Sequence, residues 1–174
     1  MEALPSIEAR GTYVSRNRES TIALGEVLGT LLGEGDVLVL TGDLGAGKTQ
    51  LTKGIARGMG VTDDVTSPTF TIEMVYQGSK LPLYHFDLYR LDGPDQLDDT
   101  GLFDVLGSDG PCVIEWGEQF AEQIGDERVD VFLSRLDDEV GAGVEPPRRI
   151  RFQAHDQRGE ELVDALDAAV AARR

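Results

Sequence analysis

The chain has 174 residues, of which 40% are hydrophobic and 28% charged, a composition that suits a globular protein and excludes a disordered one. Asp and Glu number 32 against 16 Lys and Arg, so the formal net charge is −16. Because nucleic-acid backbones are bound mainly through clusters of Lys and Arg, direct binding of DNA or RNA by this chain alone is disfavoured.

A single cysteine, Cys112, excludes an internal disulfide framework and disfavours a zinc site built from thiolates. No uncharged apolar stretch approaches the length of a membrane-spanning helix, and the first residues lack the pattern of a secretory signal. We therefore expect no membrane association and a location in the reducing cytoplasm.

The first part of the sequence predicts an edge strand followed by a helix. Residues 7–14 alternate loosely between apolar and polar side chains, which is typical of a strand. Apolar residues then recur with helical spacing up to Leu32, so the sequence predicts an amphipathic helix that ends at the glycines after it. Ser20 or Thr21 is the expected cap at the start of this helix.

A strand, a glycine-rich turn and a second helix follow. The run Val37–Leu40 is apolar throughout, as in a parallel strand buried on both faces. After Gly47, apolar residues four apart predict a helix that closes near Gly58 and Gly60.

Two alternating runs flank Gly78-Ser79 and predict an antiparallel hairpin with a two-residue turn; the first run begins at Phe70. Pro82 indicates that one of these strands lies at an edge or has an unpaired position.

The second half of the chain predicts a short helix after Asp92, a buried strand at 112–114, a strand pair at 129–133 and 149–152, and a closing helix over 162–170. This order of elements predicts an α/β fold with a mixed, partly parallel sheet flanked by helices. We expect one domain over residues 1–174.

The segment GDLGAGKT fits the phosphate-binding pattern G-x-x-x-x-G-K-[ST] at every required position. Glycines allow successive amide N–H groups to face an anion, and the helix that follows adds the partial positive charge of its N-terminus. Lys48 is expected to contact the β- and γ-phosphates, and Thr49 to offer its hydroxyl to Mg²⁺. The residues of this predicted site are Gly42, Asp43, Leu44, Gly45, Ala46, Gly47, Lys48 and Thr49.

Two acidic residues stand at the ends of apolar strand patterns: Asp87 after Tyr84-His85-Phe86, and Glu115 after Val113-Ile114. A carboxylate at the carboxyl end of a parallel strand beside a phosphate loop can reach Mg²⁺ directly or through water. For either residue alone, an ordinary solvated acid is an equally good interpretation.

Other residues near these motifs leave two interpretations open. His85 is favoured as a hydrogen-bonded structural histidine over a catalytic base. Trp116 either covers the nucleotide site or fills a gap in the core. The segment 66–69, with Ser67 and Thr69, is either a nucleotide-sensing switch or a turn stiffened by proline. The basic cluster Arg148, Arg149 and Arg151 is interpreted mainly as a solvated strand face, with contact to a partner as the alternative.

Four sequence blocks occur in the order that one known family has: 42–49, 66–71 (TSPTFT), 84–90 (YHFDLYR) and 113–116 (VIEW). On these blocks, the chain resembles the TsaE (YjeE) family over about residues 20 to 120. These are small bacterial P-loop ATPases of tRNA threonylcarbamoyladenosine biosynthesis. The resemblance implies a single-domain P-loop NTPase fold, weak Mg-dependent ATP hydrolysis, and work with TsaD and TsaB. Those two proteins move a threonylcarbamoyl group onto adenosine beside the anticodon.

By matching positions, the resemblance implies that Lys48 binds phosphate, that Thr49 and Glu115 hold Mg²⁺, and that Asp87 is a second essential acid near the metal. It assigns Ser67 and Thr69 to the nucleotide-sensing segment, and the segment from Arg18 to Thr21 to the adenine side. Gln50 departs from the second threonine that many members carry after the loop.

Two other functions compete with ATP-driven work on a partner. A small-molecule P-loop kinase usually needs a lid that carries arginines, and no clear lid follows the core. A GTPase-type binding module needs Asn-Lys-x-Asp to recognise guanine, and the chain lacks that sequence. The missing guanine motif and, above all, the resemblance to the TsaE family favour ATP as the nucleotide.

Overall fold

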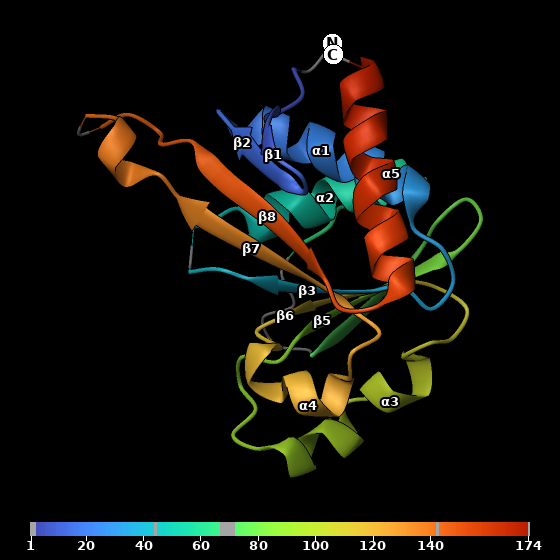
Figure 1. Ribbon diagram of the computed structural model, residues 1–174. Helices are drawn as coiled ribbons and strands as arrows, with labels where there is room; N and C mark the ends of the chain where they lie inside the picture. Colours follow the sequence, from blue (N-terminus) through green and yellow to red (C-terminus); the bar gives the residue numbers. More distant parts are fainter. Residues whose placement is uncertain (1–2, 44, 67–71, 142, 174) are drawn as a thin grey trace.

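The computed structural model describes residues 3–43, 45–66, 72–141 and 143–173, and its strands form one sheet (Figure 1). The strand order is β1-β2-β8-β7-β3-β6-β5-β4. β3 pairs in parallel with β6 and β7, and β5 in parallel with β6, whereas the remaining pairs are antiparallel. The mixed sheet that the sequence predicts is confirmed. The strands are β1 (Ser6–Ala9), β2 (Thr12–Ser15), β3 (Val37–Thr41), β4 (Glu73–Gln77), β5 (Pro82–Asp87), β6 (Cys112–Glu115), β7 (Val129–Arg135) and β8 (Arg148–Ala154).

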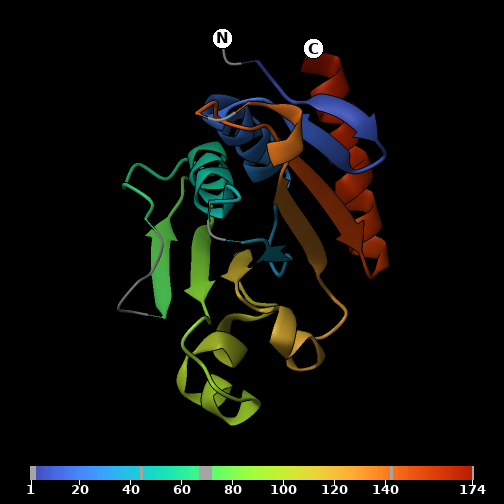
Figure 2. The same cartoon turned by 90° about the vertical axis from the view of Figure 1, so that its left-hand side faces the viewer.

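Helices cover both faces of the sheet (Figures 1 and 2). α1 (Arg18–Leu31), α2 (Lys48–Gly58) and α5 (Gln157–Arg173) lie on one face, and the short α3 (Leu102–Val105) and α4 (Ala121–Ile124) on the other. Short 3₁₀ turns are η1 (Pro94–Asp99), η2 (Glu118–Phe120) and η3 (Asp137–Glu139). No helix in the described ranges is long and apolar enough to span a membrane.

The central strand β3 contributes to two separate cores. Leu38 and Leu40 pack with the leucines of α1 and α2, whereas Val37 and Val39 pack on the opposite face with Phe86 and its neighbours. Because successive side chains of a strand point to opposite faces, a strand covered on both sides has to be apolar at every position. This explains the unbroken apolar run that precedes the glycine-rich turn.

Two predictions for the N-terminal segment are wrong in detail. Residues 7–14 form two strands, β1 and β2, because Gly11 at φ +69° reverses the chain between them. The helix α1 is capped by Asn17, whose Oδ1 accepts a hydrogen bond from the Ser20 amide at 2.8 Å. Ser20 and Thr21 therefore lie inside the first turn, where both are buried.

The predicted hairpin of β4 and β5 is confirmed, and β4 is the edge strand. Pro82 is the first residue of β5 and pairs with Gln77, a position that does not interrupt the strand pairing. The connection has four residues instead of two, since the Gly78 amide donates to the Leu81 carbonyl at 3.0 Å. The expected start of the hairpin at Phe70 lies outside the described residues.

Glycines allow α1 and α2 to cross in direct backbone contact. Gly25 and Gly29 on α1 face Gly54 and Gly58 on α2. A Cβ atom at Gly54 would lie 2.1 Å from the Ile22 carbonyl oxygen, which is closer than any real contact. The crossing therefore fixes the start of α1 relative to α2 and to the turn that precedes α2.

We expect Gly54→Ala to destabilise the protein by about 2–3 kcal/mol, the cost of overpacking a tight core contact. Chemical denaturation measures this loss. Gly141→Ala is the matched control, because a Cβ atom there would meet nothing within 4 Å. Equal stability of Gly54→Ala and the wild type would contradict the backbone contact.

Candidate nucleotide-binding site

The glycine-rich turn joins β3 to α2 and takes a shape that requires its glycines. Gly45 (φ +82°) and Gly47 (φ +107°) lie in the left-handed region that side chains disfavour. A Cβ atom at Gly42 would lie 2.5 Å from the Leu133 carbonyl oxygen. Leu44 lies outside the described residues. The described part of the turn thus has the backbone freedom that an anion-binding loop needs.

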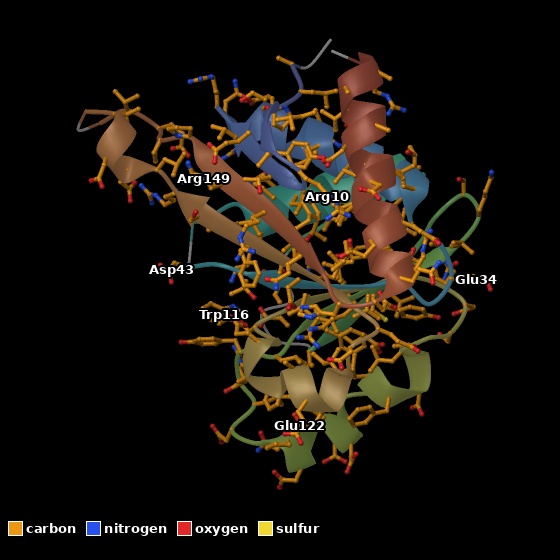
Figure 3. The ribbon with its side chains drawn as sticks, in the orientation of Figure 1. Arg10, Glu34, Asp43, Trp116, Glu122 and Arg149 are labelled. Atoms are coloured by element: carbon orange, nitrogen blue, oxygen red, sulfur yellow. The ribbon has the colours of Figure 1, made fainter. Side chains whose placement is uncertain are left out.

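A cavity of about 570 Å³ opens at this turn. The predicted residues Thr21, Gly45, Gly47, Lys48, Thr49, Asp87 and Glu115 all line it. Asp43 and Trp116 lie at the same end of the sheet (Figure 3), whereas Ala46 is buried in the core beneath the turn. Residues that are far apart in sequence therefore meet in one cavity. Ser67 and Thr69, the expected switch residues, fall outside the described residues.

Lys48 begins α2 and places a buried cation in this cavity. Its side chain is 6% exposed, and among the described residues its Nζ finds no hydrogen-bond partner. Burial lowers the pKa of Lys48, while the carboxylates of Glu115, Glu118, Asp87 and Asp43 act in the opposite direction. A buried ammonium without hydrogen bonds is costly, so the site fits an anionic ligand that supplies them.

The two predicted acids lie side by side at the ends of adjacent strands. β5 and β6 are parallel, and Asp87 pairs with Glu115 in their register. Glu115 is 3% exposed, and its Oε2 lies 2.6 Å from Nε2 of the buried His85. This contact agrees with the interpretation of His85 as a hydrogen-bonded structural residue. Burial raises the pKa of Asp87, a change opposed by the hydrogen bond that its Oδ1 accepts from the Tyr89 amide at 3.0 Å.

The oxygen atoms of Thr49, Asp87 and Glu115 suit a hard cation such as Mg²⁺. Among the residues with described positions, however, no three His, Cys, Asp or Glu side chains form a ready-made metal site. The donor set therefore fits Mg²⁺ that arrives with further oxygen ligands, such as those of a phosphate.

Arg148 belongs to this cavity, and its interpretation as part of a solvated face is wrong. β8 pairs with β7, with Arg135 opposite Arg148, and β7 pairs with β3, so the start of β8 lies near the turn that follows β3. Arg148 Nη2 donates to the Gly45 carbonyl at 2.9 Å. No local pattern could reveal a contact across 103 residues of sequence. Arg149, by contrast, pairs with Glu8 at the surface.

The start of α1 supplies a further wall that sequence reasoning found only in part. Asn17 and Arg18 line the cavity together with Thr21. The Thr21 Oγ1 lies 2.7 Å from Ser15 Oγ, which ties the first turn of α1 to β2. The helix crossing described above holds this turn against the glycine-rich loop.

Trp116 and Tyr89 form the aromatic wall. The Lys48 Nζ lies 3.8 Å from the centroid of the Trp116 ring, and the Tyr89 and Trp116 rings are 5.0 Å apart. Of the two interpretations of Trp116, the structure favours the one in which it covers the site.

The strand, phosphate loop and helix, set in a sheet with a parallel centre, define a P-loop NTPase-type protein. The family model "Threonylcarbamoyl adenosine biosynthesis protein TsaE" matches residues 15–142. The chain belongs to the TsaE family.

Relatives match over most of their length. The "tRNA threonylcarbamoyladenosine biosynthesis protein TsaE" of Bacillus subtilis is 41% identical over 150 residues, which covers 86% of this chain and 89% of the relative. The protein of the same name from Treponema pallidum is 46% identical over 125 residues, which covers 72% of this chain and 92% of the relative. The crystal structure of Bacillus subtilis YdiB has a TM-score of 0.72 and 37% identity, covering 90% of this chain and 93% of that one.

We expect Asp87→Asn to raise the melting temperature of the nucleotide-free protein at pH 7. Because burial raises the pKa of Asp87 in the folded state, its charged form destabilises the fold above that pKa. Asparagine keeps the acceptor for the Tyr89 amide and removes the charge.

The gain should shrink as the pH falls through the pKa of Asp87 in the folded state, because the wild-type carboxyl then takes up its proton. Melting curves across pH 3 to 8 measure this difference. If the difference in melting temperature between Asp87→Asn and the wild type did not change with pH, the charge of Asp87 could not be its cause.

Proposed function

We propose that this protein binds Mg-ATP in the P-loop cavity and hydrolyses it as a component of tRNA threonylcarbamoyladenosine biosynthesis. One observation carries the proposal: a buried ammonium with no hydrogen-bond partner among the described residues, at the first residue of α2, beside two carboxylates. The names of the relatives support the pathway. The absence of Asn-Lys-x-Asp supports ATP over GTP.

In this proposal Lys48 contacts the β- and γ-phosphates, and the amides of the turn from Gly42 to Thr49, including Leu44, surround the same oxygens. Thr49, Asp87 and Glu115 hold Mg²⁺, which when bound neutralises phosphate charge. His85 fixes the Glu115 carboxylate through their hydrogen bond, so that this oxygen ligand is oriented before the nucleotide arrives.

The adenine side is assigned to the first turn of α1. Arg18 and Thr21 line the cavity on that side, and Arg148 approaches the loop from β8. Ser67 and Thr69 are proposed to sense the state of the nucleotide, as the family resemblance implies. Lys48, Asp87 and Glu115 are the proposed catalytic residues.

The proposed partners are TsaD and TsaB, in the cytoplasm. The names of the relatives support the pathway, and the two partners follow from the family resemblance; the net charge of −16 fits a protein partner with a basic face. An ATPase that drives a tRNA-modifying complex does not itself need to hold tRNA, and an acidic surface fits a basic face of a partner protein. We propose that residues 1–174 act as one domain.

Lys48→Ala should abolish detectable ATP hydrolysis and leave the fold intact, because the only cation at the start of α2 is removed. A phosphate-release assay and thermal unfolding measure the two properties. Lys53→Ala, one turn further along α2 and outside the cavity lining, is the control. Wild-type turnover in Lys48→Ala would remove the phosphate-site proposal.

Glu115→Ala should weaken Mg-dependent nucleotide binding by roughly tenfold or more, as for other losses of a metal ligand or its support. Nucleotide titrations at a series of Mg²⁺ concentrations measure the effect. Glu122→Ala, an exposed acid on α4 (Figure 3), should bind as the wild type does. If Glu115→Ala left the magnesium dependence unchanged, Glu115 would be an ordinary buried acid.

Addition of TsaD and TsaB should raise ATP turnover, because the proposed hydrolysis is coupled to work on these partners. Turnover assays with and without both proteins test this, together with co-purification under ATP, ADP and no nucleotide. The absence of both stimulation and complex formation would favour the alternative function, a small-molecule P-loop kinase.

A further inference from the structure

The Lys48 ammonium, at the wall of the cavity in which it is proposed to bind phosphate, is shielded by the Trp116 ring. Its Nζ has essentially no contact with solvent and no hydrogen-bond partner among the described residues. The Trp116 ring lies over it, with 3.8 Å between Nζ and the ring centroid. A hydrogen bond from an ammonium to a phosphate oxygen needs an N···O distance of about 2.8 Å. Space for that oxygen has to open beside Nζ.

The backbone of Trp116 indicates that the position of the ring is specified by the fold. Among the described residues other than glycine, Trp116 alone has a positive φ, at +59°. A bulky residue adopts this left-handed conformation only where its surroundings hold it, and such residues cluster at functional sites. The next residue, Gly117, is fixed as well, since a Cβ atom there would lie 2.8 Å from Ile114 Cγ2.

Tyr89 supports the ring from the outside. Its ring lies 5.0 Å from that of Trp116 at an angle of 58°, and the residue is 66% exposed at the rim of the cavity. The indole thus lies between a buried cation and an exposed phenol. An aromatic face attracts a cation, but it offers no hydrogen-bond acceptor for the three N–H groups of the ammonium.

We propose that Trp116 is a positioning residue that caps the Lys48 ammonium and has to leave it when a phosphate binds there. The inference rests on the proposed function of the cavity. In the capped conformation the ring takes the place of an anion at Nζ and holds the ammonium ready at the start of α2. Entry of a phosphate then requires the ring to withdraw and the stacking on Tyr89 to change.

Reductive methylation with formaldehyde and borohydride tests the cap without any nucleotide. The chain has three lysines, so Lys53 and Lys80 serve as internal references in the same peptide digest. In the wild type we expect Lys48 to react at least tenfold more slowly than the exposed Lys80. Burial lowers the pKa of Lys48, which by itself would speed its reaction, so protection reports occlusion.

Trp116→Gly should raise the methylation rate of Lys48 several-fold, because glycine accepts the positive φ and only the ring is lost. Trp116→Phe keeps an aromatic face and should retain most of the protection. Phe103→Ala, an exposed aromatic on α3 outside the cavity lining, should change nothing. Equal reactivity of Lys48 in the wild type and in Trp116→Gly, with Lys53 unchanged in both, would overturn the inference.

A second measurement follows the ring itself. Trp116 is the only tryptophan, so its emission reports its surroundings directly. Mg-ATP should make the indole more accessible to quenching by acrylamide. In stopped-flow with a fluorescent ATP analogue, which needs no tryptophan, Trp116→Gly should associate several-fold faster than the wild type. If calorimetry detects binding while quenching and association rates stay unchanged, the withdrawal of the ring is overturned and the proposed function stands. No heat of binding would overturn the proposed function, while methylation still decides the cap.

Discussion

The nucleotide site is organised around one buried cation, the ammonium group of Lys48. Lys48 is the first residue of α2, where the partial charge of the helix N-terminus is positive, and its ammonium is buried without a hydrogen bond to any described residue. The ammonium and the positive end of the helix dipole lie together there, and the neighbouring carboxylates offset the cost of the buried charge only in part. An anion with several oxygens removes both costs at once. Phosphate binding is therefore the state in which the site is electrostatically complete.

The rest of the fold holds the groups of this site in place. β3 is covered on both faces, so the turn after it starts from a rigid strand. The glycine crossing of α1 and α2 brings Thr21 against the loop, and the parallel register of β5 and β6 sets Asp87 beside Glu115. The helix crossing and the strand register are contacts between backbone atoms. Loss of these contacts would move the residues of the site relative to one another, although every charged group would still be present.

Sequence reasoning succeeded where the signal is local. The apolar run before the turn, the spacing of the motif and the acids at two strand ends are each signals within a few residues. The structure brings residues of the motif and both acids into one cavity. Arg148 could not be found in this way, because its contact with Gly45 depends on the pairing of β8 with β7, the strand beside β3. Gly11 was misjudged as part of one strand, because an alternating pattern of side chains does not reveal a reversal of the chain.

The central claim is that the turn before α2 and the Lys48 ammonium together bind the terminal phosphates of ATP. A crystal structure with Mg²⁺ and a non-hydrolysable ATP analogue tests it most directly. The claim requires the β- and γ-phosphate oxygens to accept hydrogen bonds from Lys48 Nζ and from the amides of this turn. A nucleotide bound elsewhere, with Lys48 making no phosphate contact, would contradict it.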